Sequence, residues 1–182
     1  MALQTSLLPD WFSQLDPARP VLYFTMGSTG YTRFFSDAIQ LFGDTEYQII
    51  MTTGGLALDV DRVPANCFIE EFAPGRLLME RSDAVVNHGG NGTVYQAIAA
   101  GTPLIGIPYH IDQEINLQRV EALGMGFMIS EKQCTPARLK TALLSLLEDP
   151  SYRENAQRLR ASLDQYDGPV LAAAHINRFL QG

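Results

Sequence analysis

Seven residues between an apolar run and a helical pattern carry the clearest chemical signal in this chain. They occupy positions 87–93 and read Asn-His-Gly-Gly-Asn-Gly-Thr. Glycines let a backbone approach a ligand closely and adopt positive φ, and free amides at a helix start attract an anion. His88 adds a ring N–H and Thr93 a hydroxyl, so the loop is typical of a phosphate cradle. Taken alone, it fits a tight turn with an incidental histidine equally well.

Two further loops carry polar groups after apolar runs. Residues 26–30 read Met-Gly-Ser-Thr-Gly, and residues 108–113 read Pro-Tyr-His-Ile-Asp-Gln. Asp112 is suited to cap the following helix. Phe72 follows a third apolar run, where an aromatic ring fits packing in the core.

The elements that must position these loops alternate between short apolar strands and helices. Such alternation predicts an α/β fold, a Rossmann-like parallel sheet with helices on both faces. Ligands then bind beyond the carboxyl ends of the strands, where all these loops lie. The expected strands are 21–25, 47–51, 66–69, 84–86, 104–107 and 126–129, and the expected helices are 31–42, 77–81, 93–100, 113–123, 136–147, 151–163 and 170–180.

Size and composition narrow the function classes. The chain has 182 residues and a formal net charge of -7, so it suits one globular domain and repels a nucleic-acid backbone. Two cysteines, Cys67 and Cys134, make neither a disulfide framework nor a metal site. No run approaches the roughly 20 apolar residues of a membrane span, and no basic leader precedes the domain, so we expect a cytoplasmic protein.

The region from Glu80 to Gly126 resembles a known family. Its ordered features are a strand, the 87–93 loop, Ala-Gly-Thr-Pro, Pro-Tyr-His-Ile-Asp-Gln and Asn-Leu-Gln-Arg-Val. This order is similar to the signature of the UDP-glycosyltransferase superfamily, including macrolide-type bacterial glycosyltransferases. The resemblance extends from about Pro9 to the end of the chain and implies the C-terminal half of a GT-B fold. We expect an inter-domain lead-in over residues 1–19 and a nucleotide-sugar donor-binding domain over residues 20–182.

The resemblance also assigns roles to single residues. Asp112 and Gln113 would bind the transferred sugar, Asn116 would support their loop, and Phe72 would stack on the base. Gln96 stands where the family usually has a ribose-binding glutamate, and Gly75 where a glutamine is common, so the sequence departs from the family pattern at a ribose-binding and at a base-binding position. Donor diphosphate contacts would come from Gly27, Ser28, His88, Gly90, Asn91, Gly92 and Thr93.

The implied activity is transfer of a hexose from a UDP- or TDP-sugar by an inverting, metal-independent mechanism without a cofactor. His88 would stabilise the leaving diphosphate, and no Asp-x-Asp motif suggests a metal site. The acceptor and the catalytic base would belong to an N-terminal domain outside this chain, so the chain alone would bind donors but transfer little. We favour a fragment of a longer protein over one half of a split enzyme. A sugar-nucleotide 2-epimerase half and a non-catalytic nucleotide-binding subunit are the alternatives.

Overall fold

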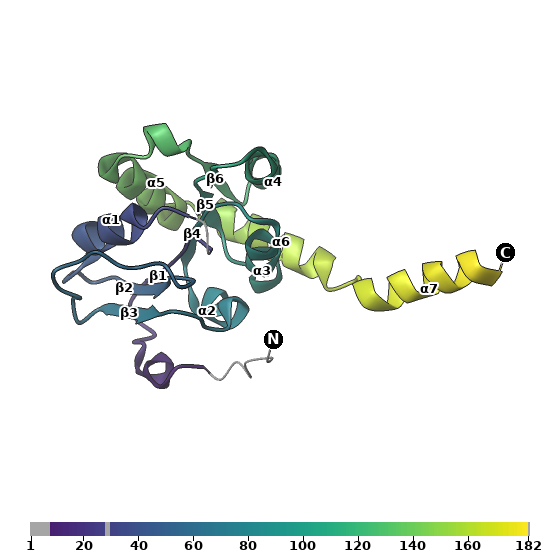
Figure 1. The fold of residues 1–182 in the computed structure, drawn as a ribbon, viewed down its shortest axis with the longest axis horizontal. Helices are drawn as coiled ribbons and strands as arrows, with labels where there is room; N and C mark the ends of the chain where they lie inside the picture. Colours follow the sequence, from purple (N-terminus) through teal and green to yellow (C-terminus); the bar gives the residue numbers. More distant parts are fainter. Residues whose placement is uncertain (1–7, 28–29, 182) are drawn as a thin grey trace.

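The computed structural model describes residues 8–27 and 30–181, which form a six-stranded parallel sheet between helices (Figure 1). The strand order is β3-β2-β1-β4-β5-β6, which confirms the α/β prediction. Each strand coincides with one of the predicted apolar runs to within one or two residues. Their bounds are β1 Val21–Thr25, β2 Gln48–Thr52, β3 Cys67–Glu70, β4 Ala84–Asn87, β5 Leu104–Gly106 and β6 Gly126–Met128.

The helices follow the predicted segments, with two informative differences at their starts. The third helix begins at Asn91 and the fourth at Ile111, two residues earlier than expected, because Gly90 and His110 are extended and end the preceding loops. Residues 91–93 therefore belong to a first helical turn. The helices are α1 Arg33–Phe42, α2 Gly75–Arg81, α3 Asn91–Ala100, α4 Ile111–Ala122, α5 Pro136–Glu148, α6 Pro150–Leu163 and α7 Gly168–Gln181, with short 3-10 helices η1 Asp10–Gln14 and η2 Glu131–Gln133.

Each face of the sheet has its own hydrophobic core. On one face, α1 and α5 pack Phe35 and Leu143 against Phe24 and its neighbours. On the other, α2, α3, α4 and α6 cover residues such as Tyr23 and Val85. Because strands covered on both faces must be apolar throughout, the continuous runs in the sequence predicted this layering correctly.

The strand order reverses between β1 and β4, which lie side by side at the centre of the sheet. Thr25 pairs with Asn87 at the carboxyl ends of these two strands. The chain leaves β1 toward α1 on one face and leaves β4 toward α3 on the other. Such a switch point opens a crevice between the two loops and is where ligands bind in open α/β sheets.

The 3-10 helix η1 packs on the edge of the sheet. The Trp11 ring stacks on Phe68 with centroids 5.0 Å apart, and its Nε1 donates to Glu70 at 2.7 Å. Leu15 is buried at the end of η1. This apolar contact, with one indole hydrogen bond, fixes the path of the chain into β1.

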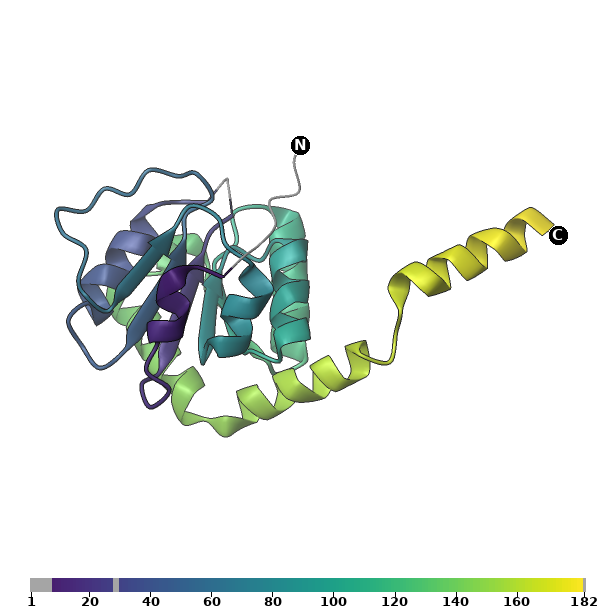
Figure 2. The ribbon, with the colours of Figure 1, turned by 90° about the horizontal axis from the view of Figure 1, so that it is seen from below.

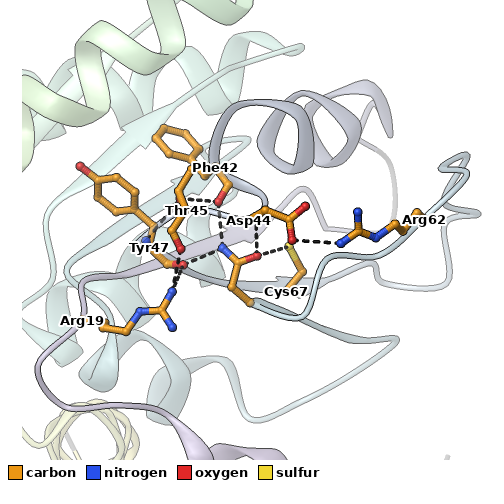
Figure 3. A network of polar contacts seen from close by, with 8 residues as sticks. Arg19, Phe42, Asp44, Thr45, Tyr47, Arg62 and Cys67 are labelled. Atoms are coloured by element: carbon orange, nitrogen blue, oxygen red, sulfur yellow. Dashed lines mark hydrogen bonds and ion pairs between the residues drawn. The ribbon is translucent and has the colours of Figure 1, made fainter.

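A buried amide holds the turn between α1 and β2 (Figure 3). Asn66 donates through Nδ2 to the carbonyls of Phe42 and Tyr47, at 2.8 and 2.7 Å. Its Oδ1 accepts from the amide of Asp44 at 2.9 Å. Asp44 has a positive φ of 56°, so the turn depends on this side chain for both its hydrogen bonds and its unusual backbone.

Helix α7 stands away from the sheet and its covering helices (Figures 1 and 2). None of its residues is buried, and Ile176, Phe179 and Leu180 are among its exposed apolar side chains. The helical pattern predicted this element, but not its separation from the body. Within the described residues, no helix is both long and apolar enough to cross a membrane.

Candidate functional site

The cradle loop begins where β4 ends. Asn87 is fully buried, and its Oδ1 accepts a hydrogen bond from the Gly89 amide at 2.6 Å. Asn116 on α4 donates to the Gly89 carbonyl at 3.0 Å, so it supports the 87–93 loop rather than the loop of Asp112 and Gln113 that it was expected to support. A Cβ at Gly89, whose φ is 83°, would lie 2.6 Å from Leu117. The turn is therefore fixed by two asparagines and by close packing on α4.

His88 lies between two glycines. A Cβ at Gly27 would stand 2.8 Å from His88 Cε1, and one at Gly90 would stand 2.5 Å from Nε2. The ring is only 9% exposed. These contacts place the imidazole between the loops that follow β1 and β4, at the strand-order switch. Ser28, the next predicted contact in the first loop, lies outside the described residues.

Two buried polar atoms in this loop have no hydrogen-bond partner. Among the residues that the structure describes, they are Asn87 Nδ2 and His88 Nδ1. Buried polar groups are nearly always paired, and an orphan of this kind marks either a functional position or a site for water. Both orphans lie at the carboxyl end of the central strand, where a ligand is expected.

The environment of His88 favours its neutral form in the free protein. Burial lowers the pKa of the ring, the negative charge of Asp112 raises the pKa in part, and His110 lowers it further. Asp112 and His110 therefore act electrostatically on His88, although they lie on the next loop of the sheet. The structure thus brings the predicted diphosphate and sugar loops together.

The start of α3 offers a row of free amides. The first intrahelical bond runs from Val94 to the Gly90 carbonyl, so the amides of Asn91, Gly92 and Thr93 precede it and have no helical partner. A Cβ at Gly92 would meet nothing within 4 Å. Of the three glycines in this loop, only Gly89 has a positive φ. Gly90 is needed for the contact with His88, and Gly92 leaves space open.

Gln113 in the sugar loop is more engaged than the sequence suggested. It is 5% exposed, and its Oε1 accepts from the amides of Tyr109 and His110 at 2.8 and 3.3 Å. Its Nε2 is then the atom left for a ligand. The capping alternative for Asp112 is wrong, because His110 occupies the N-cap position and Asp112 lies exposed in the first turn of α4.

Phe72 is 63% exposed, which overturns the alternative that it packs in the core. It lines a pocket of about 240 Å³ with Thr25, Gly27, Thr52, Gly54, Glu71 and Ala73. Gln96 is exposed on α3, and a Cβ at Gly75 would lie 2.6 Å from its Oε1. The two departures from the family pattern, at 75 and 96, are therefore neighbours in space.

The sequence did not single out Thr25, Thr52 or Glu71. The two threonines end β1 and β2, where they pair in register and face the pocket with Glu71. A polar residue at the last position of an otherwise apolar strand was the available signal. Only the strand register, which the sequence does not reveal, shows that these residues meet.

A larger pocket of about 560 Å³ lies at the opposite edge, beside the amino ends of β1, β4 and β5. Three arginines line it, but each already serves the fold. Arg19 donates to the carbonyls of Thr45, Glu46 and Tyr47, and Arg81 to that of Asp16. Arg153 donates to the carbonyls of Ser82 and Asp83. The arginines of this larger pocket are therefore already engaged in the fold. For this reason we place the candidate site at the carboxyl edge of the sheet, although the pocket there is smaller.

Strand order, layering and the loops at the β1–β4 switch define the C-terminal α/β domain of a GT-B glycosyltransferase. The chain belongs to the family described as Erythromycin biosynthesis protein CIII-like, C-terminal domain, which matches residues 37–173. It is 32% identical over 151 residues to a PGL/p-HBAD biosynthesis rhamnosyltransferase of Mycobacterium bovis, covering 83% of this chain and 33% of that protein. The predicted family is confirmed.

Solved structures agree. The calicheamicin glycosyltransferase CalG4 superposes with a TM-score of 0.84 at 28% identity, covering 99% of this chain and 47% of that one. Glycosyltransferase VinC in complex with DTDP gives a TM-score of 0.74 at 26% identity, covering 87% of this chain and 41% of that one. This chain thus spans a third to a half of the proteins that it resembles.

Proposed function

We propose that this chain binds the nucleotide-sugar donor of a glycosyltransferase, a UDP- or TDP-hexose, and stabilises the diphosphate as it leaves. The single observation that carries this proposal is the arrangement at the β1–β4 switch. A buried imidazole lies against Gly90, the N-cap of α3, beside the free amides that begin this helix. Fixed donors of this kind stabilise charge that develops on a leaving group, because they need no reorganisation during the reaction.

The positions of the hexose and the base follow from the proposed diphosphate site. The hexose extends toward Asp112, whose charge already acts on His88, and the base reaches the exposed ring of Phe72. We infer a metal-independent, inverting transfer with no cofactor, in which amides and an imidazole take the place of a cation beside the diphosphate. A chelator should then leave nucleotide affinity unchanged.

The acceptor and the base that deprotonates it belong to an N-terminal domain outside this chain, in the same polypeptide or in a partner. Support comes from the coverage of the relatives, since this chain spans less than half of each matched structure. The exposed apolar residues of α7 are suited to contact that domain. The relative from Mycobacterium bovis is a rhamnosyltransferase, which favours transfer over epimerisation.

Calorimetric titration with TDP, UDP and their glucose conjugates tests the proposal. Wild type should bind at least one of them, and His88→Ala should weaken that binding by roughly 10- to 150-fold, the range of a charge-assisted hydrogen bond. His175→Ala, on exposed α7, is the matched control and should bind like wild type. The absence of binding by a folded wild type, or equal binding by His88→Ala, would refute the proposal.

A further inference from the structure

The β1 loop, residues 26–31, is contacted at both ends by one tyrosine side chain. The Tyr109 hydroxyl accepts a hydrogen bond from the Tyr31 amide at 3.4 Å and donates to Met26 Sδ at 3.7 Å. The rings of Tyr31 and Tyr109 also meet edge to face, with their centroids 4.7 Å apart and their planes at 86°. Tyr109 therefore joins the beginning of the β1 loop to its end.

The β1 loop turns back tightly on its first residue. A Cβ at Gly30 would collide with the Met26 carbonyl oxygen and lie 2.5 Å from Met26 Cβ. Met26 is fully buried, and Tyr109 packs against the same hydrophobic core. Burial raises the pKa of Tyr109 to about 12, so the phenol keeps its hydrogen at neutral pH and donates it to the sulfur. The contacts of Tyr109 thus hold the β1 loop from the core side.

The backbone of Tyr109 belongs to the loop that carries the predicted sugar ligands. Its amide donates to Gln113 Oε1 at 2.8 Å, and Gln113 is buried. Its side chain reaches the β1 loop, in which Gly27 lies against the His88 imidazole. Both hydrogen bonds of the hydroxyl are long, so each contributes little, and the edge-to-face ring pair is the stronger contact. One residue thus links the sugar loop to a glycine that confines His88.

Resting on the proposed function, we propose that Tyr109 is a positioning residue for the donor diphosphate, acting through Gly27 and His88. Its ring holds the β1 loop in the conformation that keeps Gly27 against the imidazole. The imidazole lies against both Gly27 and Gly90, so a displaced β1 loop would remove one of these two contacts and let the ring move. Hydrogen-bond donors stabilise a diphosphate best when they are fixed in advance. Affinity should therefore fall although every donor is still present.

Titrations of Tyr109→Leu with TDP and inorganic pyrophosphate test this role. Loss of the ring pair should weaken the binding of both ligands by the same factor, roughly 2- to 12-fold, because the contacts to the base are unaltered. Tyr109→Phe keeps the ring pair and should recover most of the affinity. Tyr31→Leu removes the same pair from its other side and should reproduce the loss. Because Tyr31 is 54% exposed, this variant tests the pair even where Tyr109→Leu destabilises the fold. The double variant should bind no more weakly than the weaker single variant.

A second ring pair supplies the matched control. Tyr152 on α6 is a half-buried tyrosine whose ring centroid lies 4.8 Å from that of Phe127. Tyr152→Leu should lower the free energy of unfolding in urea about as much as Tyr109→Leu does, but leave TDP affinity unchanged. A double-mutant cycle tests the route through the imidazole. In a His88→Ala background, Tyr109→Leu should weaken TDP binding by a smaller factor than in wild type, since no ring remains to be positioned.

The outcomes separate this role from the proposed function. Weaker TDP binding in His88→Ala, with wild-type affinity in folded Tyr109→Leu or in Tyr31→Leu, would overturn the positioning role and leave the donor site standing. An equal loss of affinity in Tyr152→Leu, or an undiminished effect of Tyr109→Leu in the His88→Ala background, would also overturn it. If folded wild type binds neither TDP nor UDP, both assignments fall.

Discussion

The imidazole of His88 rests directly against Gly27, so closely that a Cβ at position 27 would stand 2.8 Å from its Cε1. These residues are 61 positions apart in the chain, and they meet because β1 and β4 are neighbours in the sheet. Gly27 also has a φ of 62°, which most residues adopt only under strain. The position of His88 in the proposed diphosphate site therefore depends on the backbone conformation of Gly27 and on the adjacency of β1 and β4.

Gly27→Ala tests that contact. The new methyl should displace the ring and strain the loop, lowering the free energy of unfolding by about 1–2 kcal/mol and TDP affinity by roughly tenfold or more. Gly92→Ala is the matched control for folding, because its Cβ would meet nothing within 4 Å. It should leave stability unchanged or raise it by up to about 1 kcal/mol. Urea unfolding and calorimetry measure both effects, and wild-type TDP affinity in Gly27→Ala would contradict the account.

Nucleotide binding should take up a proton at His88. Burial lowers the pKa of the free ring, and a bound diphosphate favours the charged form and raises it. Affinity for TDP should therefore rise as pH falls toward about 6. Calorimetry in buffers of different ionisation enthalpy counts the protons, and His88→Gln corrects for titration of the phosphate itself. Equal proton uptake in both proteins would exclude this role for His88.

The lowered pKa of His88 also predicts how the stability of the free protein depends on pH. A histidine whose pKa is depressed on folding contributes stability above its unfolded value of about 6.5, and that stability is lost as pH falls through this region. His88→Gln should remove this part of the pH dependence of unfolding. An unchanged slope between wild type and the variant, measured by urea unfolding from pH 7.5 to 5.5, would count against the buried, neutral ring.

Asn66 and Asn116 should separate stability from binding. Asn66→Ala leaves the Asp44 amide without its partner and removes one hydrogen bond from each of the Phe42 and Tyr47 carbonyls (Figure 3), which still accept from Thr45 Oγ1 and Arg19. The free energy of unfolding should therefore fall by about 1–3 kcal/mol, with TDP affinity unchanged. Asn116→Ala frees the Gly89 carbonyl in the cradle and should lower TDP affinity by roughly 3- to 10-fold with about 1 kcal/mol of destabilisation. The reverse pattern in the two variants would show that Asn116 does not support the site.

The sequence predicted the helices and strands better than it predicted the contacts between them. Apolar runs and helix spacing located every strand and every α-helix, and polar loops after strands pointed to the carboxyl edge of the sheet. Helix starts at Asn91 and Ile111 were missed, since extended glycine and histidine residues are hard to recognise as caps. The contact of His88 with Gly27 and the pairing of Thr25 with Thr52 depend on strand order and register, which local patterns do not encode. The position of α7 away from the sheet depends on tertiary contacts, which its own helical pattern does not specify.

A crystal structure of the protein soaked with TDP is the most direct test of the central claim. The account predicts the diphosphate against the amides of residues 91–93 and the ring of His88, with the base beside Phe72. A nucleotide bound instead in the larger pocket beside Arg19, Arg81 and Arg153, with the turn after β4 unoccupied, would contradict it.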